Sequence, residues 1–596
     1  MFKILIKRHF THFFYFYSHL GYRVYIALTL SLIVGILDGF GLAMFFPLLQ
    51  MVGGEEKVSG DGLGGMAFLI NGLQGMGIDI NIFSVLVLII VFFSLKGIAK
   101  FTEQYYNVIT QQYFIRKLRF KNISQLNNYN FKSFVLADSG KIQNTLGGEV
   151  ARISNAYRNY FMAVQFGILV FVYLFLAMLT NPQFAVLVAI GGGLSNLIYS
   201  QIYKKTKAIS KNITTGSHLF QGLLIQTVAF FKYLKATGFM EQYSEKLKGV
   251  VTYIENSNKK IGFYNSLLTA TREPLVILVV VLVIMIQISF FAENIGVIVL
   301  SLLFFYRSLN ALVQMQNHWN IFLNMSGSLE NMKEFMQEMA LDQEQQGQTT
   351  IDVFRSEITL EQVSFSYGDS SILKNINLTI KKNQTIAFVG ESGSGKTTLI
   401  NLIVGLMPPK SGVLAIDGVD FQGMNRTSYQ KRIGYITQEP VIFTDNIYNN
   451  ITRWAPKTPE NMCRFWASLE KAAILDYVKS LPGQENSLLG DNGVLISGGQ
   501  KQRLSIAREL FKEIDILVMD EATSALDSET EKAIQENIER LKGQYTILII
   551  AHRLSTIKAA DQVVLLKKGE IKAVGEYHAL IQSSKSFKKM VSLQEV

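Results

Sequence analysis

Six long apolar runs within the first 315 residues limit most strongly what this chain can fold into. A bilayer core about 30 Å thick needs about 20 mostly apolar residues in a helix. Runs of this kind occupy Tyr25–Gln50, Ile82–Lys100, Tyr160–Leu179, Phe184–Tyr203, Pro274–Phe291 and Ile295–Met315. Six buried helices of a soluble core would leave too little polar surface in this part of the chain. The sequence therefore predicts six transmembrane helices.

The composition agrees with a membrane protein. Hydrophobic residues make up 49% of the 596 residues and charged residues 17%, against about 25% charged residues in an ordinary soluble domain. This balance excludes a disordered, collagen-like or coiled-coil chain. The net charge of +11 does not require a nucleic-acid partner, and we expect none. The single cysteine, Cys463, excludes an intrachain disulfide, and we interpret it as a small apolar residue in a helix.

The charges of the loops predict the orientation of the spans. Residues 1–24 carry four basic and no acidic side chains, residues 100–157 eight and three, and residues 204–273 eleven and four. Residues 52–80 carry one lysine and four acids. Because basic residues concentrate in cytoplasmic loops, the N-terminus and the two long loops are expected in the cytoplasm. No cleavable signal peptide is evident.

The two long inner loops have a helical pattern. We therefore expect the second to fifth spans to continue as helices well beyond the bilayer. Each pair would be joined by a short turn segment, around 138–150 and around 213–226. The outer loop contains an amphipathic piece, Met66–Leu73.

The second half of the chain has the pattern of a different domain. Leu341–Thr350 is rich in Gln, Glu and Thr and is typical of a linker. From Ile351 onward, short β-branched runs alternate with helical patterns, which predicts an α/β domain with a mostly parallel sheet. The fold expected is an all-α transmembrane domain of six long helices plus an α/β phosphate-loop nucleotide-binding domain. Its bounds are 1–340 for the transmembrane domain, 341–356 for the linker and 357–596 for the nucleotide-binding domain.

A glycine-rich run indicates nucleotide binding. It follows the apolar strand Thr385–Val389 and precedes a helical run, and its glycines let backbone N–H groups wrap phosphates. Lys396 would reach the β- and γ-phosphates, and Thr397 would ligate Mg²⁺. The nucleotide-binding residues expected here are Gly390, Ser392, Gly393, Ser394, Gly395, Lys396, Thr397 and Thr398.

Two further strands are followed by residues that could bind a metal ion or take part in catalysis. Ile516–Met519 is followed by Asp520 and Glu521. A carboxylate at a strand tip beside a phosphate loop supplies the second Mg²⁺ contact, which suits Asp520. Glu521 can then polarise the water that attacks the γ-phosphate. His552, at the end of the strand Ile547–Ala551, lies where a sensor of the γ-phosphate would.

These residues resemble the nucleotide-binding domain of ATP-binding-cassette transporters, over about 357–590. The resemblance implies that Tyr367 stacks on adenine and that Gln438 contacts Mg²⁺ and couples to the membrane domain. It also implies that His552 is a switch histidine. One departure is Ile496, where the family most often has leucine, a swap of similar volume. The resemblance further assigns a signature loop, Ser497, Gly498, Gly499 and Gln500, and a loop across a dimer, Ser524, Ala525, Leu526 and Asp527.

The resemblance also implies a dimer. In this family, the phosphate loop of one subunit and the signature loop of another sandwich one ATP, so a chain with one cassette is half a transporter. Both halves of the site look intact here, including Glu521, which favours a homodimer over pairing with a degenerate partner. The segments Ser139–Ile142 and Phe231–Gly238 look like inner-loop patterns of exporters. The loop turns would then be coupling helices that dock near Gln438, and ATP-driven closure would drive alternating access.

Two ionisable residues deep in the spans bear on the substrate. Asp38 and Arg307 are costly in a bilayer and should face a cavity or a partner. For Arg307, a substrate path and a structural clamp remain equal alternatives. For Asp38, a structural role is favoured because nearby glycines, Gly35, Gly39 and Gly41, suggest close helix packing.

The first span looks similar to that of flippases for lipid-linked oligosaccharides and of polysaccharide exporters, on the basis of Ile36–Gly41 and Pro47. An arginine-lined cavity would suit the anionic head group of a lipid-linked glycan. Peptide or drug export, and import on the same architecture, stay open. A soluble twin-cassette ATPase would need two cassettes and no spans, and an ATP-gated regulator often lacks the acid at Glu521. We expect a multi-pass protein of a bacterial inner membrane, with the lipid bilayer as a partner and the cassette in the cytoplasm.

Overall fold

The computed structural model describes residues 11–52, 67–77, 79–180, 182–291, 295–520, 536, 539–551 and 553–592. The chain forms two compact units. The helical unit consists of Met1–Tyr129 and Leu136–Asp342, and the cassette unit of Asn130–Val135 and Gln343–Val596.

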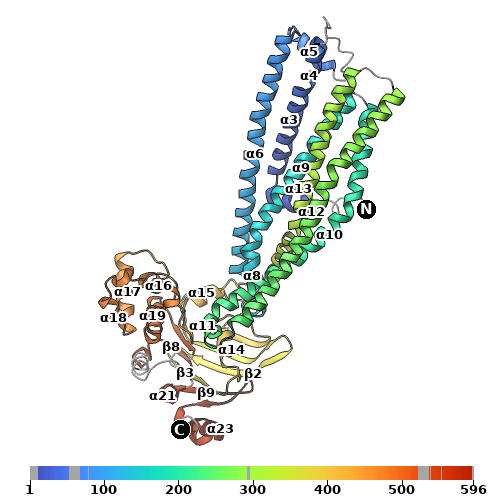
Figure 1. Ribbon diagram of the computed structural model, residues 1–596. Coiled ribbons are helices and arrows are strands. Elements are labelled where there is room, and N and C mark those ends of the chain that lie inside the picture. Colours follow the sequence, from blue (N-terminus) through green and yellow to red (C-terminus); the bar gives the residue numbers. More distant parts are fainter. Residues whose placement is uncertain are drawn as a thin grey trace. The chain divides into compact units, whose positions relative to one another are not determined.

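Helices make up the described part of the first unit, and its long helices run side by side in a bundle (Figure 1). α13 packs along α9, α10 packs against α12 and α13, and α3 packs against α6. The helices are α2 (Thr11–Leu20), α3 (Arg23–Ala43), α4 (Phe45–Val52), α5 (Ala67–Gly75), α6 (Ile82–Asn127), α8 (Ser139–Leu146), α9 (Gly148–Thr180), α10 (Pro182–Ala229), α11 (Phe231–Ala236), α12 (Met240–Phe291) and α13 (Ile295–Leu341). The expected all-α first domain is confirmed.

Among the described residues, three helical stretches are long and apolar enough to cross a membrane: Arg23–Leu48, Ile82–Asn127 and Gly148–Thr180. The other three expected spans lie within α10, α12 and α13. The first expected span corresponds to Arg23–Leu48, within which α3 ends at Ala43 and α4 begins at Phe45. Pro47 explains the break, since its ring would clash with the carbonyl four residues earlier in a continuous helix.

The predicted helical extensions are confirmed, but one turn was misplaced. α6, α10 and α12 contain 46, 48 and 52 residues, and α8 falls in the segment predicted around 138–150. The turn predicted around 213–226 is wrong, because α10 continues to Ala229. The chain turns instead around α11 and Gly238, whose φ of +74° is a backbone conformation that glycine adopts readily.

Glycines set the closest helix contacts in this unit. A Cβ built on Gly35 or Gly39 would meet side chains of α9, and one on Gly41 would meet Phe93 of α6. The close packing predicted for these three glycines is confirmed. A Cβ on Gly140 would lie 2.6 Å from Cα of Gly222, so α8 and α10 meet backbone to backbone.

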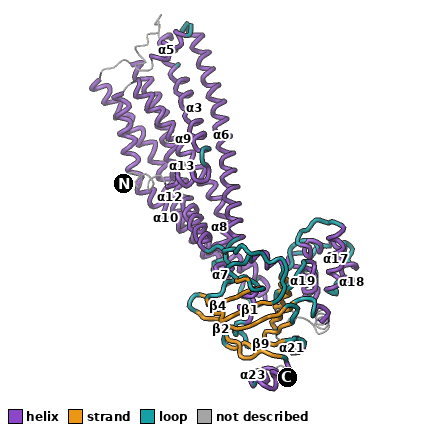
Figure 2. Tube along the Cα trace, turned by 180° about the vertical axis from the view of Figure 1, so that it is seen from behind, coloured by secondary structure: helices purple, strands orange, loops and turns teal. Residues whose placement is uncertain are grey.

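The cassette unit contains two sheets with helices around them (Figures 1 and 2). A four-stranded sheet has the order β2-β1-β4-β5 and is antiparallel, and a six-stranded sheet has the order β10-β9-β3-β8-β7-β6. In the latter only the pairing of β10 with β9 is antiparallel, which confirms the mostly parallel sheet. The strands are β1 (Glu357–Tyr367), β2 (Ser370–Lys381), β3 (Thr385–Val389), β4 (Ser411–Ile416), β5 (Val419–Asp420), β6 (Ile433–Ile436), β7 (Ile516–Asp520), β8 (Thr546–Ile550), β9 (Gln562–Lys567) and β10 (Glu570–Gly575).

The six-stranded sheet is buried on both faces. Along β3, Ile386 and Phe388 pack into one hydrophobic cluster and Ala387 and Val389 into another, as expected for a parallel sheet. The short helix α7 (Phe131–Leu136) begins in the part of the cassette unit that comes from the loop after α6, and Phe131 packs against the first of these clusters. The remaining helices are α14 (Lys396–Ile403), α15 (Arg426–Lys431), α16 (Ile447–Thr452), α17 (Pro459–Lys471), α18 (Leu475–Ser480), α19 (Gly498–Phe511), α21 (Leu554–Lys558), α22 (Tyr577–Ser583) and α23 (Lys585–Ser592).

The contact between α8 and α10 yields a prediction. Gly140→Ala should destabilise the protein by about 1–3 kcal/mol, because the added methyl group meets backbone that cannot move aside as a side chain can. Thermal unfolding of the purified protein in detergent measures this as a lower midpoint. Gly249→Ala on α12 is the matched control, because a Cβ there meets nothing within 4 Å. Equal midpoints for the two variants would contradict the close approach.

Candidate functional site

The expected site residues gather at the carboxyl ends of four neighbouring parallel strands. β3 is followed across the sheet by β8, β7 and β6. The register pairs Phe388 with Ile550, Ile550 with Asp520, and Met519 with Ile436. The loops that leave these strands therefore begin side by side, although they are far apart in the sequence.

The loop after β3 brings backbone amides together. Gly390, Gly393 and Gly395 have φ values of +152°, +76° and +103°, which residues with side chains rarely adopt. A Cβ on Gly390 would lie 2.2 Å from the carbonyl oxygen of Leu566, so only glycine fits there. The loop, which also contains Ser392, leads into the first turn of α14, where the helix dipole and the unpaired N–H groups favour a phosphate.

Two buried side chains of this loop fit a polyphosphate. Lys396 is 6% exposed, and its Nζ donates to the carbonyl oxygens of Gly390 at 2.8 Å and Glu391 at 3.2 Å. Ser394 is 4% exposed, and its Oγ has no hydrogen-bond partner among the described residues. Phosphate oxygens would satisfy the hydroxyl and pair with the ammonium group. Thr397 and Thr398 follow in the first turn of α14.

Oxygen ligands for a cation come from the neighbouring strands. Asp520 ends β7, and Gln438 follows β6 by two residues. Tyr435 of β6 donates to Oδ2 of Asp520 at 3.5 Å, and burial, reinforced by this carboxylate, raises the pKa of Tyr435. The phenol therefore stays a donor and orients Asp520. The sequence analysis did not identify Tyr435. Its place on the strand that precedes Gln438 is the sequence feature that could have indicated it.

No group of three or more His, Cys, Asp or Glu side chains is placed to hold a metal in the described part of the chain. Thr397, Gln438 and Asp520 are therefore a sparse ligand set, of the kind that suits Mg²⁺ when phosphate oxygens complete its coordination.

Tyr367 lies near the phosphate loop, on the four-stranded sheet. It ends β1, and its ring meets that of Phe365 edge-on at 5.0 Å. Its hydroxyl donates to Sδ of Met407 at 3.2 Å. Phe365 pairs in register with Leu373 of β2, whose side chain lies 2.8 Å from a Cβ built on Gly395. The partly buried Tyr367 is thus connected to the phosphate loop through Phe365 and Leu373.

The signature segment begins a helix. Ser497 is the N-cap of α19, where its Oγ accepts from the backbone N–H of Gln500 at 3.3 Å and its own N–H donates to Oε1 of Gln500 at 2.9 Å. This reciprocal capping box fixes the first turn, which contains Gly498 and Gly499. Ile496 packs partly buried against the hydrophobic core. Glu521, His552 and the loop Ser524–Asp527 lie outside the described residues.

In the helical unit, Asp38 already has its charge neutralised. It is 3% exposed, and Lys96 of α6 donates to its Oδ1 at 2.5 Å, while the hydroxyl of Tyr173 of α9 donates to Oδ2. Asp38 thus connects three helices, α3, α6 and α9. Sequence analysis did not single out Lys96. The signal was a lysine within the second apolar run, at a depth comparable to that of Asp38.

Arg307 has a different environment. It is exposed on α13 and close enough to Tyr173 to interact with it electrostatically. It has no hydrogen bond or ion pair with any residue that the structure describes. Asp38 is bound by Lys96 and Tyr173 and makes no ion pair with Arg307.

Comparisons with known proteins show what this chain is similar to. A sequence model described as ABC transporter matches residues 373–524. The heterocyst differentiation ATP-binding protein HepA of Nostoc sp. is 32% identical over 462 residues, which cover 77% of this chain and 75% of that protein. An ATP-dependent lipid A-core flippase of Syntrophus aciditrophicus is 41% identical over 40% of this chain and 39% of the flippase.

Two further similarities extend the comparison. A protein of Staphylococcus aureus named as a multidrug export ATP-binding/permease protein is 40% identical over 42% of this chain and 43% of its own length. This chain thus matches about two fifths of that permease, as it does of the flippase. The structure of a bacterial Atm1-family ABC exporter with ATP bound superposes with a TM-score of 0.78 at 20% identity, covering 97% of this chain and 99% of the exporter. This last similarity establishes the fold.

The ion pair of Asp38 with Lys96 yields a prediction. Asp38→Asn should destabilise the protein by about 3–5 kcal/mol, because it leaves the ammonium group of Lys96 unpaired among apolar helices. Asp38→Asn combined with Lys96→Met should recover most of this loss. Thermal unfolding in detergent compares the variants. If the double variant were no more stable than the single one, the pair would not be the stabilising contact.

Proposed function

Because this chain belongs to the ABC transporter family, we propose that it is an ATP-driven exporter or flippase that works as a homodimer by alternating access. The observation that carries this proposal is the arrangement at one edge of the parallel sheet, where a phosphate loop with a buried lysine adjoins the strands that end near Asp520 and Gln438. The same chain presents a capped signature helix, and apolar helices long enough for a bilayer precede the cassette.

Each predicted site residue of the cassette has a proposed role in ATP binding or hydrolysis. Lys396 and the loop amides hold the β- and γ-phosphates, and Tyr367 stacks on adenine. Thr397, Gln438 and Asp520 hold Mg²⁺, which when bound neutralises charge on the phosphate oxygens. Glu521 accepts a proton from the attacking water. His552 contacts the γ-phosphate.

A second copy completes each site. Ser497, Gly498, Gly499 and Gln500 of one subunit face the nucleotide in the phosphate loop of the other, together with Asp527. Ser497 supports this role because the N-terminus of α19 carries a partial positive charge that suits a γ-phosphate. Closure of two cassettes on two ATP molecules would reach the spans through α8 and α11, which we propose dock near Gln438 of a cassette.

We propose an amphipathic anion, such as a lipid-linked glycan, as the substrate. The guanidinium group of Arg307, which has no ion pair with any described residue, supports an anionic head group, and one similar protein is named as a lipid A-core flippase. Another is named for multidrug export, which keeps peptide or drug export as the second candidate, and import on the same architecture is the third. The proposed location is a bacterial inner membrane, with the N-terminus and the cassette in the cytoplasm.

The proposed role of Glu521 in hydrolysis yields a prediction. Glu521→Gln should keep ATP binding but lower turnover at least about 10²-fold, because it removes the general base. Phosphate release by the purified protein measures turnover, and binding of a fluorescent ATP analogue measures occupancy. Glu460→Gln on the exposed face of α17 is the matched control. Near-normal hydrolysis by Glu521→Gln would remove Glu521 from its role.

The proposed role of Arg307 in substrate binding yields another prediction. Arg307→Ala should abolish the stimulation of ATPase activity by a polyprenyl pyrophosphate in the bilayer and leave basal activity intact, because only the head-group contact is lost. Arg307→Lys, which keeps the charge, should retain part of the stimulation. Equal loss of basal and stimulated activity would assign Arg307 to a structural clamp instead.

A further inference from the structure

The chain segment that joins α13 to β1 is bound to the cassette along most of its length. We call residues 347–356 the strap. A Cβ built on Gly347 would lie 2.1 Å from the backbone carbonyl carbon of Gly423, so two backbones touch there. The N–H of Gly347 donates to the carbonyl oxygen of Met424 at 3.0 Å, and the N–H of Thr349 donates to the carbonyl oxygen of Gly423 at 3.0 Å. The strap is thus fixed from its first residue.

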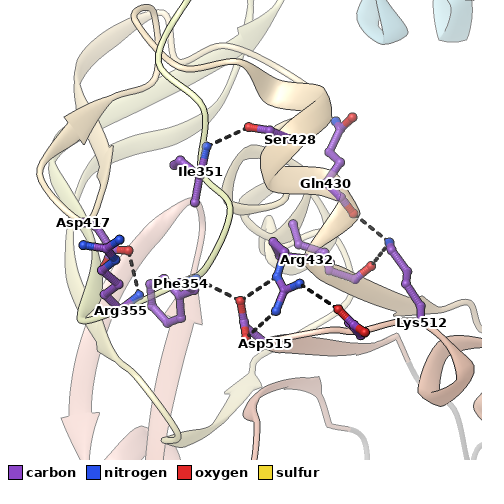
Figure 3. Close-up of polar contacts among 11 residues, drawn as sticks. Ile351, Phe354, Arg355, Asp417, Ser428, Gln430, Arg432, Lys512 and Asp515 are labelled. Carbon is purple, nitrogen blue, oxygen red and sulfur yellow. Dashed lines mark hydrogen bonds and ion pairs between the residues drawn. The ribbon is translucent and has the colours of Figure 1, made fainter.

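The middle of the strap is held by both its backbone and its side chains. The N–H of Ile351 donates to Oγ of Ser428 at 2.8 Å (Figure 3). The side chains of Ile351 and Phe354 are 5% and 0% exposed and pack into a hydrophobic cluster of the cassette. Apolar burial therefore anchors this part of the strap in addition to the hydrogen bonds.

One carboxylate holds the end of the strap. Asp417, which follows β4, accepts from the backbone N–H groups of Arg355 at 2.7 Å, Ser356 at 2.7 Å and Glu357 at 3.1 Å, and from the hydroxyl of Ser356 at 2.8 Å. Figure 3 shows the bond from Arg355. Since α13 ends at Leu341, only residues 342–346 lie between this helix and a strap that is bound throughout.

The strap meets the amino ends of β6 and β7 at a single residue, Asp515. Oδ2 of Asp515 accepts from the backbone N–H of Phe354 at 2.8 Å and from Nε of Arg432 at 2.8 Å, and Oδ1 accepts from Nη2 of Arg432 at 3.0 Å (Figure 3). Arg432 directly precedes β6, and Asp515 directly precedes β7. One carboxylate therefore joins the strap to both strands.

The charge of Asp515 strengthens these bonds. Its side chain is 13% exposed. Burial alone would raise the pKa of Asp515, but the hydrogen bonds from Arg432 and Phe354 outweigh this effect and lower it. The carboxylate thus stays ionised, and hydrogen bonds to an ionised acceptor are stronger than those between neutral groups.

The same two strands carry residues that we assign to Mg²⁺. β7 ends at Asp520, and Gln438 follows β6 by two residues. The strands pair in register from Ile433 with Ile516 to Ile436 with Met519. Because the ladder fixes one strand against the other, a shift at their amino ends is carried to their carboxyl ends. Small displacements matter there, since ligands and reacting groups must be held within a fraction of an ångström.

We propose that Asp515 is a positioning residue, which ties the strap to β6 and β7 and thereby sets where Gln438 and Asp520 stand for Mg²⁺. The inference rests on the Mg²⁺ role proposed above for these two residues. It gives the end of α13 a connection to the metal ligands that runs along the chain and through the strap. This connection is separate from the docking proposed for α8 and α11.

A binding measurement on the full chain in phosphatidylcholine nanodiscs tests this role. A fluorescent, non-hydrolysable ATP analogue is titrated once with Mg²⁺ and once with EDTA, and the ratio of the two affinities reports the metal ligands. Asp515→Ala should lower this ratio at least about 3-fold, because the ligands are displaced. The affinity in EDTA should stay unchanged, since β8 separates β7 from β3 and its phosphate loop. Asp515→Asn, whose remaining side-chain oxygen can accept from Phe354, should keep most of the ratio.

Two further variants separate the strap from general support of the sheet. Asp417→Ala releases the end of the strap without removing a contact of β6 or β7, so it should also lower the ratio. Asp561→Ala is the matched control, because the carboxylate of Asp561 accepts from the N–H of Thr385 at 2.8 Å, at the amino end of β3, which the strap does not hold. This control should leave the ratio unchanged. A general folding defect would instead lower the affinity in EDTA as well.

Several results would overturn the inference. A wild-type ratio for Asp515→Ala, a wild-type ratio for Asp417→Ala, or an equal fall for Asp561→Ala would each do so. Asp520→Asn shows whether the inference fails alone. If Asp520→Asn lowers the ratio and Asp515→Ala does not, only the positioning role is wrong. If Asp520→Asn leaves the ratio unchanged, the proposed Mg²⁺ site is wrong, and the positioning role is overturned with it.

Discussion

The parallel pairing of β3, β8, β7 and β6 is the constraint on which the rest of the cassette depends. Because the strands run in one direction and pair in order, the loops that follow them begin at one edge. The strand pairing thereby brings the phosphate loop, Asp520 and Gln438 to the same edge of the sheet, although they lie far apart in the sequence. The buried side chains on both faces of β3 hold this edge rigid, and a rigid edge can keep phosphate oxygens, water and cation in register.

In the helical unit the main constraint is different: a buried carboxylate, that of Asp38, must be paired with a cation and a hydrogen-bond donor. Lys96 and Tyr173 satisfy Asp38, and glycines of α3 allow α9 and α6 to come close enough for these contacts. Arg307 is then the exposed cation of this region that has no paired acid among the described residues. Among the described residues, Asp38 thus contributes to helix packing, whereas Arg307 stays exposed on α13.

Sequence alone predicted those features that local patterns determine. The strand Thr385–Val389 was placed at its observed ends, because an apolar run stops at a glycine that must adopt a positive φ. The turn predicted around 213–226 was wrong, since the helical pattern runs on to Ala229 and nothing in that segment stops a helix. Lys96 was missed because the partner of Asp38 lies 58 positions away on another helix.

The central claim is that each ATP site is built from two copies of this chain. Co-expression of Lys396→Ala with Ser497→Arg, followed by an ATPase assay on the purified mixture, tests it most directly. Each variant alone should be inactive, the first for want of a phosphate-binding lysine and the second for want of a signature serine. In a mixed dimer, the intact phosphate loop of one copy meets the intact signature loop of the other, so the mixture should regain activity. A mixture as inactive as its components, with mixed dimers demonstrated by differential tags, would contradict the shared site.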